Sequence, residues 1–117
     1  MDTKQTIRVS QVIGSSICVA IEDGQKVFDI LHQAISESTQ LNVSFEGIEL
    51  IISAFLNTAI GQLYGEFSEK EIEDTIFYLF LEKDDQELLQ IVVDNAKRYY
   101  RNQKEYDSAM QEVLEYA

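Results

Sequence analysis

Hydrophobic and polar positions alternate most clearly in the middle of the chain. Leu41, Val43 and Phe45 recur at every second position, which is the spacing of a strand with one buried face. A tight turn is expected next, at Gly47, because glycine reaches positive φ without a steric penalty. This pattern predicts a buried strand that ends in a sharp change of direction.

A helix is predicted after this turn and a short connection. Apolar residues from Phe55 to Leu63 recur at helical spacing. Ser53 precedes them as the expected helix N-cap, and Gly65 follows at the place of a C-cap glycine. We interpret residues 41–65 as the central strand–loop–helix unit of an α/β domain.

The segments before this unit predict a β-hairpin and a helix. Residues 6–13 and 17–21 are two β-rich runs separated by the turn sequence Gly14-Ser15-Ser16. A helix is then expected from Asp23, as its N-cap, to about Ser38.

The segments after the central unit predict a short helix and a strand. Ser68 and Glu71 have the spacing of a capping box, which starts a short helix ending near Glu73. Residues 75–81 (TIFYLFL) indicate a strand buried on both faces, in a central position of a partly parallel sheet. The sequence therefore predicts an α/β fold with a mixed sheet of about four strands and helices mainly on one face. Four side chains are expected to be almost fully buried in its core: Phe45, Phe55, Leu63 and Phe77.

Residues 85–117 carry a sustained heptad stripe, uninterrupted by glycine or proline. The stripe allows one continuous helix, or a break near Asn102-Gln103 with residues 104–117 folding back as a second helix. Either arrangement needs a surface to cover the apolar positions in the second half. We expect an antiparallel homodimer that brings the basic middle of one helix toward the acidic end of the other. Its interface is predicted to centre on Tyr99, Tyr106, Met110 and Val113.

Composition and charge exclude several classes of function. The 117 residues fit one domain, and 26% charged and 45% apolar residues are typical of a soluble globular protein. A net charge of −12 argues against nucleic acid as a partner, because phosphate binding needs clustered Lys and Arg. Residues 66–87 hold nine acids against two lysines, either as a solvated surface or as a docking face for a basic partner.

Cellular location is predicted from what the sequence lacks. No apolar run is long enough for a membrane span, and the first residues lack the apolar core of a signal peptide. Cys18 is the single cysteine and is expected to be a small core residue. We therefore expect a cytoplasmic protein that does not bind membranes.

Motifs that carry catalytic chemistry are missing from the sequence. It contains no Walker motif, CxxC, HExxH or GxSxG. His32 is the only histidine and is expected at the boundary of a helix face, without the neighbouring ligands of a metal site. We expect neither catalysis nor a cofactor.

The central unit also resembles a known family. FEGIELI followed by SAFLNTAIGQLYGEFSEKEI is similar to the STAS-like domain family of unknown function found in bacterial proteins. The resemblance is clearest over residues 41–72 and extends from about 22 to 100. It implies residues 1–102 as a STAS-like α/β domain, with residues 103–117 as its C-terminal helical extension.

More distantly, the chain resembles the anti-sigma factor antagonists of the STAS superfamily. Their central strand is followed by a segment close to Asp-Ser-Ser-Gly, whose first serine is phosphorylated by a partner kinase. This chain has Ile52-Ser53-Ala54-Phe55 there, so Ser53 matches that serine by position. Ser53 is therefore expected to be a phosphosite or simply a helix N-cap.

Taken with the missing catalytic motifs, the resemblance implies a non-catalytic regulatory module in bacterial signalling. Its partner would be a histidine-kinase-like ATPase or a serine kinase module. The alternative is an acidic inhibitor or decoy, whose surface occupies a basic site on another protein.

Overall fold

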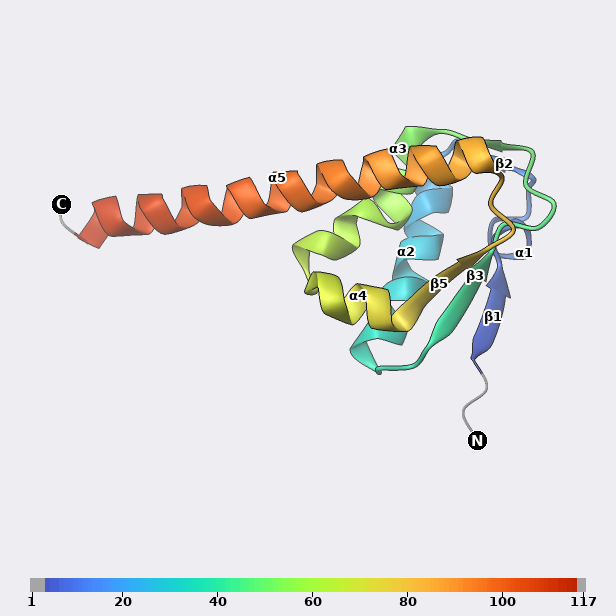
Figure 1. Ribbon diagram of the computed structural model, residues 1–117, viewed down its shortest axis with the longest axis horizontal. Coiled ribbons are helices and arrows are strands. Elements are labelled where there is room, and N and C mark those ends of the chain that lie inside the picture. The colour runs from blue at the N-terminus through green and yellow to red at the C-terminus, as the bar shows by residue number, and fades with distance from the viewer. Residues whose placement is uncertain (1–3, 116–117) are drawn as a thin grey trace.

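A three-stranded parallel sheet lies along one side of the fold (Figure 1). The computed structural model describes residues 4–115, except for the side chains of Tyr106, Ser108 and residues 111–115. The sheet has the order β1-β3-β5, and Val43 of the middle strand is paired with Ile7 on one side and Tyr78 on the other. The strands are β1 (Gln5–Arg8), β3 (Leu41–Ser44) and β5 (Ile76–Leu79).

The strand predicted at residues 75–81 exists, but its central position was wrong. It is β5, which lies at the edge of the sheet, and the alternating strand β3 takes the centre. Phe77 on β5 is only half-buried, with the ammonium of Lys4 3.7 Å from the centre of its ring. The other three predicted core residues are confirmed, because each is at most 3% exposed: Phe45, Phe55 and Leu63.

The predicted N-terminal hairpin was also wrong. After β1 the chain forms the short helix α1 (Val9–Ile13), whose buried residues Val9 and Ile13 lie one helical turn apart. Gly14 ends this helix with a left-handed backbone, at φ 69°. The next strand is β2 (Ile17–Cys18), and it pairs with β4 (Leu50–Ile51) in a separate two-stranded parallel sheet.

Most helices cover one face of the three-stranded sheet (Figure 1). The opposite face carries Thr6, Asn42 and Phe77, which are exposed or half-buried. The covering elements are α2 (Ile21–Ser36), α3 (Ser53–Ala59), the 3₁₀ helix η1 (Gly61–Gly65) and α4 (Glu69–Thr75). The predicted α/β class with helices mainly on one face is confirmed, but both sheets are wholly parallel rather than mixed.

Two helix boundaries differ from the prediction. Helix α2 begins two residues before Asp23, with Ala20 as its N-cap, so Asp23 lies in the first turn, where the helix dipole favours a negative charge. Gly65 does not cap α3, which ends at Ala59 with Ile60 at its C-cap. It is the last residue of the 3₁₀ helix that follows.

The C-terminal segment is one continuous helix, α5 (Lys83–Glu115), without the break near Asn102-Gln103 that the sequence also allowed. Figure 1 shows its second half reaching well beyond the rest of the fold. The radius of gyration is accordingly 15.9 Å, whereas a compact chain of this length has about 13 Å. Across residues 4–115, no helix combines the length and apolar composition that a membrane crossing requires.

Candidate protein-interaction site

The two-stranded sheet presents an apolar surface to solvent. Cys18 and Ile51 are paired across it and point inward, since both are buried. Side chains alternate along a strand, so the residues next to Cys18 and Ile51 in the chain point outward. Three of these are exposed apolar residues, and together we call them the β2–β4 face: Val19 (39% exposed), Leu50 (48%) and Ile52 (36%).

Backbone hydrogen bonds hold this face in place. The Glu49 amide donates to the Ser16 carbonyl at 2.8 Å, and the Ile52 amide donates to the Cys18 carbonyl at 3.1 Å. The Ser16 hydroxyl also donates to the Glu49 carboxylate at 2.8 Å. Ile21, which begins α2 two residues after Val19, is also an exposed apolar residue, at 59%.

Ser53 lies immediately beside the β2–β4 face. It is exposed and is the first residue of α3. The predicted capping role was wrong, because Ile52 has the extended backbone of the N-cap position and Ser53 is already helical. Whether Ser53 is phosphorylated stays a prediction, and the structure places its hydroxyl where solvent reaches it.

Cys18 lies behind the same face as a packing residue. Its side chain is fully buried, as the sequence predicted. Burial is the main cause that raises the pKa of the thiol from 9.0 to about 11, and the carboxylates of Asp23 and Asp85 contribute in the same direction. The thiol is therefore protonated at neutral pH and is a poor nucleophile.

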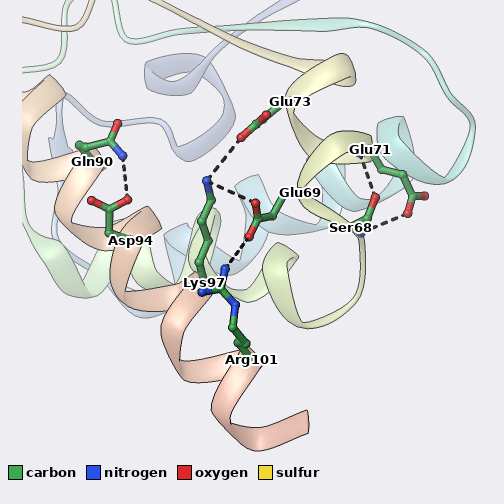
Figure 2. Close-up of polar contacts among 8 residues, drawn as sticks. All are labelled: Ser68, Glu69, Glu71, Glu73, Gln90, Asp94, Lys97 and Arg101. Carbon is green, nitrogen blue, oxygen red and sulfur yellow. Dashed lines mark hydrogen bonds and ion pairs between the residues drawn. The ribbon is translucent and has the colours of Figure 1, made fainter. Parts of the chain in front are cut away.

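A second cluster of polar side chains joins α4 to α5 (Figure 2). The Lys97 ammonium lies 3.8 Å from the Glu69 carboxylate and 3.4 Å from that of Glu73, and the Arg101 guanidinium lies 3.4 Å from Glu69. We call this cluster the α4–α5 ionic seam. It brings Glu69 and Glu73, from the acid-rich residues 66–87, onto basic side chains of α5 in the same molecule.

The capping box at the start of α4 is confirmed. The Glu71 amide donates to the Ser68 hydroxyl at 3.1 Å, and the Ser68 amide donates to the Glu71 carboxylate at 3.1 Å (Figure 2). The two bonds satisfy amides that the first turn of a helix leaves without partners. They fix the direction in which α4 presents Glu69 and Glu73 to α5.

His32 sits at the edge of α2, where its Nε2 contacts the Glu66 carboxylate. Its ring packs against those of Phe28 and Phe67, with centroids 5.6 Å and 5.0 Å away. Within residues 4–115, no group of three His, Cys, Asp or Glu side chains is arranged to hold a metal ion. The histidine therefore links α2 to the segment before α4.

Sequence reasoning found Ser53 but missed the β2–β4 face. The signal was present in the apolar runs 17–21 and 48–52. The first run was assigned to a hairpin with residues 6–13, so its outward side chains were never placed beside those of the second. Of the predicted dimer residues, Tyr99 and Met110 are exposed at 61% and 42%, and the side chains of Tyr106 and Val113 lie outside the described part of the structure.

Comparison with known proteins gives one family. A family model described as a STAS-like domain of unknown function matches residues 23–86, which is more than half of the chain. The match runs from α2 to the first turn of α5 and includes β3, β4, α3, α4 and β5. No curated protein and no solved structure matches the chain.

Proposed function

The chain belongs to the STAS-like family of unknown function, and from this we propose that it is a non-catalytic regulatory module that binds a partner protein through the β2–β4 face. The exposed apolar surface beside Ser53 carries this proposal. Contiguous exposed apolar side chains are typical of protein interaction sites, because covering them removes apolar area from water.

Phosphorylation of Ser53 would give this surface a switch. A phosphoryl group adds roughly −2 charge, directly beside Ile52 in the chain. A partner that covers the face would then have to desolvate this charge. We therefore propose that the unmodified face binds and that phosphorylation weakens binding.

The partner that we propose is an ATPase or a serine kinase module of a bacterial signalling system. The distant resemblance to the anti-sigma factor antagonists supports this class of partner. Cys18 is a free, buried cysteine, and free thiols are typical of the reducing cytoplasm, which supports a cytoplasmic setting.

The acidic decoy receives less support. Glu69 and Glu73 are already engaged by Lys97 and Arg101 of the same molecule, which neutralises part of the acidic segment. A decoy complex would be weakened strongly by salt, because exposed charges are screened. The complex proposed here should lose little affinity with salt, since apolar area dominates its interface.

The test is a pull-down from the source cells with and without ATP. The unmodified protein should recover an ATPase or kinase in a nucleotide-dependent manner. Leu50→Arg should lose it, whereas Ile91→Arg should retain it, because Ile91 is also exposed (56%) but belongs to α5 and is not part of the β2–β4 face. If both variants retain the partner, or if nucleotide has no effect on recovery, the proposed function is wrong.

A further inference from the structure

The second half of α5 leaves the body of the protein as a projecting arm. We call residues 97–115 the α5 arm. Before it, Leu89, Val92 and Ala96 are at most 8% exposed, because the helix packs on the core there. In the arm, Tyr99 and Met110 are large side chains left at 61% and 42% exposure. Figure 1 shows no other described element beside the outer half of the arm.

Charge is strictly segregated along the arm. Residues 97–104 (KRYYRNQK) contain four basic side chains and no acidic one. Residues 105–115 (EYDSAMQEVLE) contain four acidic side chains and no basic one. The inner part of the arm therefore carries +4 and the outer part −4, in a protein whose net charge is −12.

We propose that a second copy of this chain covers the arm, with the two α5 helices antiparallel. This direction places the basic inner part of each helix against the acidic outer part of the other, which is favourable for both copies. A parallel pair would place basic against basic and acidic against acidic, and would be repelled. This inference is independent of the proposed function, which uses a different surface.

The spacing of the apolar stripe is also compatible with an antiparallel pair of α5 helices. Its positions in the arm include Tyr99, Gln103, Tyr106 and Met110, spaced alternately by four and three residues. The stripe is symmetric about the midpoint between residues 104 and 105. A two-fold axis at that midpoint sets Tyr99 opposite Met110 of the second copy, so one surface is complementary to itself.

Two basic side chains are available for the contact. Lys97 and Arg101 are engaged in the α4–α5 ionic seam. Arg98 and Lys104 are exposed, and neither has an ion pair with another described residue. The same two-fold axis brings Arg98 near Glu112 of the second copy and Lys104 near its Glu105. Because residues 99–110 span only about 18 Å of helix, the dimer should be weak and dependent on concentration.

Sedimentation equilibrium of the full chain, over roughly 1 µM to 1 mM, tests the dimer. The unmodified protein should dimerise within this range, and less strongly at high salt. Met110→Glu should remain monomeric. Ala109→Glu is the matched control, because Ala109 is an exposed neighbour outside the stripe, and it should keep the dimer. Circular dichroism should show unchanged helix content in both variants.

Charge reversal tests the antiparallel direction. Arg98→Glu combined with Lys104→Glu should weaken dimerisation by at least about tenfold. Adding Glu105→Lys and Glu112→Lys to the same chain should restore it, because both proposed pairs then join opposite charges again. Gln103→Cys and Tyr106→Cys variants, each made in a Cys18→Ala background so that one cysteine remains per chain, should form a disulfide-linked heterodimer when mixed and oxidised.

A protein that stays monomeric up to 1 mM, on the order of the weakest specific complexes, would overturn the proposal. The antiparallel direction would be wrong if the variant with both basic residues reversed still dimerised. It would also be wrong if the variant with all four charges reversed stayed monomeric. Loss of the dimer would leave the ATP-dependent pull-down through the β2–β4 face unaffected, so the two proposals fail separately.

Discussion

Tyr100 of α5 lies directly against the backbone of Gly65, at the end of η1. A Cβ atom placed on Gly65 would be only 2.5 Å from the Tyr100 Cε1 atom. Gly65 does not need positive φ, since its backbone belongs to the 3₁₀ helix. Its missing side chain therefore lets the base of the α5 arm pack closely on the body, and the helix projects beyond the body after this contact.

Gly65→Ala should destabilise the fold by about 1–3 kcal/mol, the usual cost of forcing extra atoms into a packed contact. The cost should largely disappear in a Tyr100→Ala background, because the clash is with that ring. Urea denaturation of the four proteins in this double-mutant cycle measures the coupling. Equal effects of Gly65→Ala in both backgrounds would contradict the contact.

Phe55→Ala should cost about 3–5 kcal/mol, because it removes a large, fully buried side chain and leaves a cavity. Its relative exposure is 0%. Phe80→Ala is the control: Phe80 is 65% exposed, so its truncation should change stability by less than about 1 kcal/mol. Thermal or urea unfolding distinguishes the two, and similar melting of both variants would show that the core is not centred on α3.

The two helix-start serines should respond differently to truncation. Ser68→Ala should cost about 1 kcal/mol, because Ser68 accepts the Glu71 amide in a complete capping box. Ser53→Ala should cost only a few tenths of a kcal/mol, as is usual for an exposed position away from such a feature. Paired urea titrations measure both, and a larger loss for Ser53→Ala would restore its predicted capping role.

Stability should decline as the pH rises from 9.0 toward 11. The Cys18 pKa is raised from 9.0 to about 11 in the folded state, so the unfolded chain loses the thiol proton first. Below pH 9 both states keep the proton, and the full contribution to stability is present. Cys18→Ala should flatten this decline. Comparing urea midpoints of the two proteins at pH 8 and pH 10.5 checks it, and parallel declines would exclude Cys18 as the cause.

The sequence by itself determined the features that depend on near neighbours in the chain. The alternation in β3, the positive φ of 81° at Gly47 and the Ser68 capping box all arise from contacts within a few residues. The residues quoted for the family resemblance lie in this same part of the chain, and that family is confirmed. Such local patterns identify an element and its buried face, because one short segment contains all the interactions that they describe.

Only the tertiary structure decided which elements meet. An alternating run shows that a strand has an inner and an outer face, but any other strand can complete its hydrogen bonds. Residues 17–18 therefore fitted a hairpin with residues 6–13 as well as the parallel pairing with β4 that the fold adopts. That pairing creates the β2–β4 face beside Ser53, and the approach of Tyr100 to Gly65 sets where α5 leaves the body. Both relationships join residues more than thirty positions apart, and no local period encodes the distance between them in space.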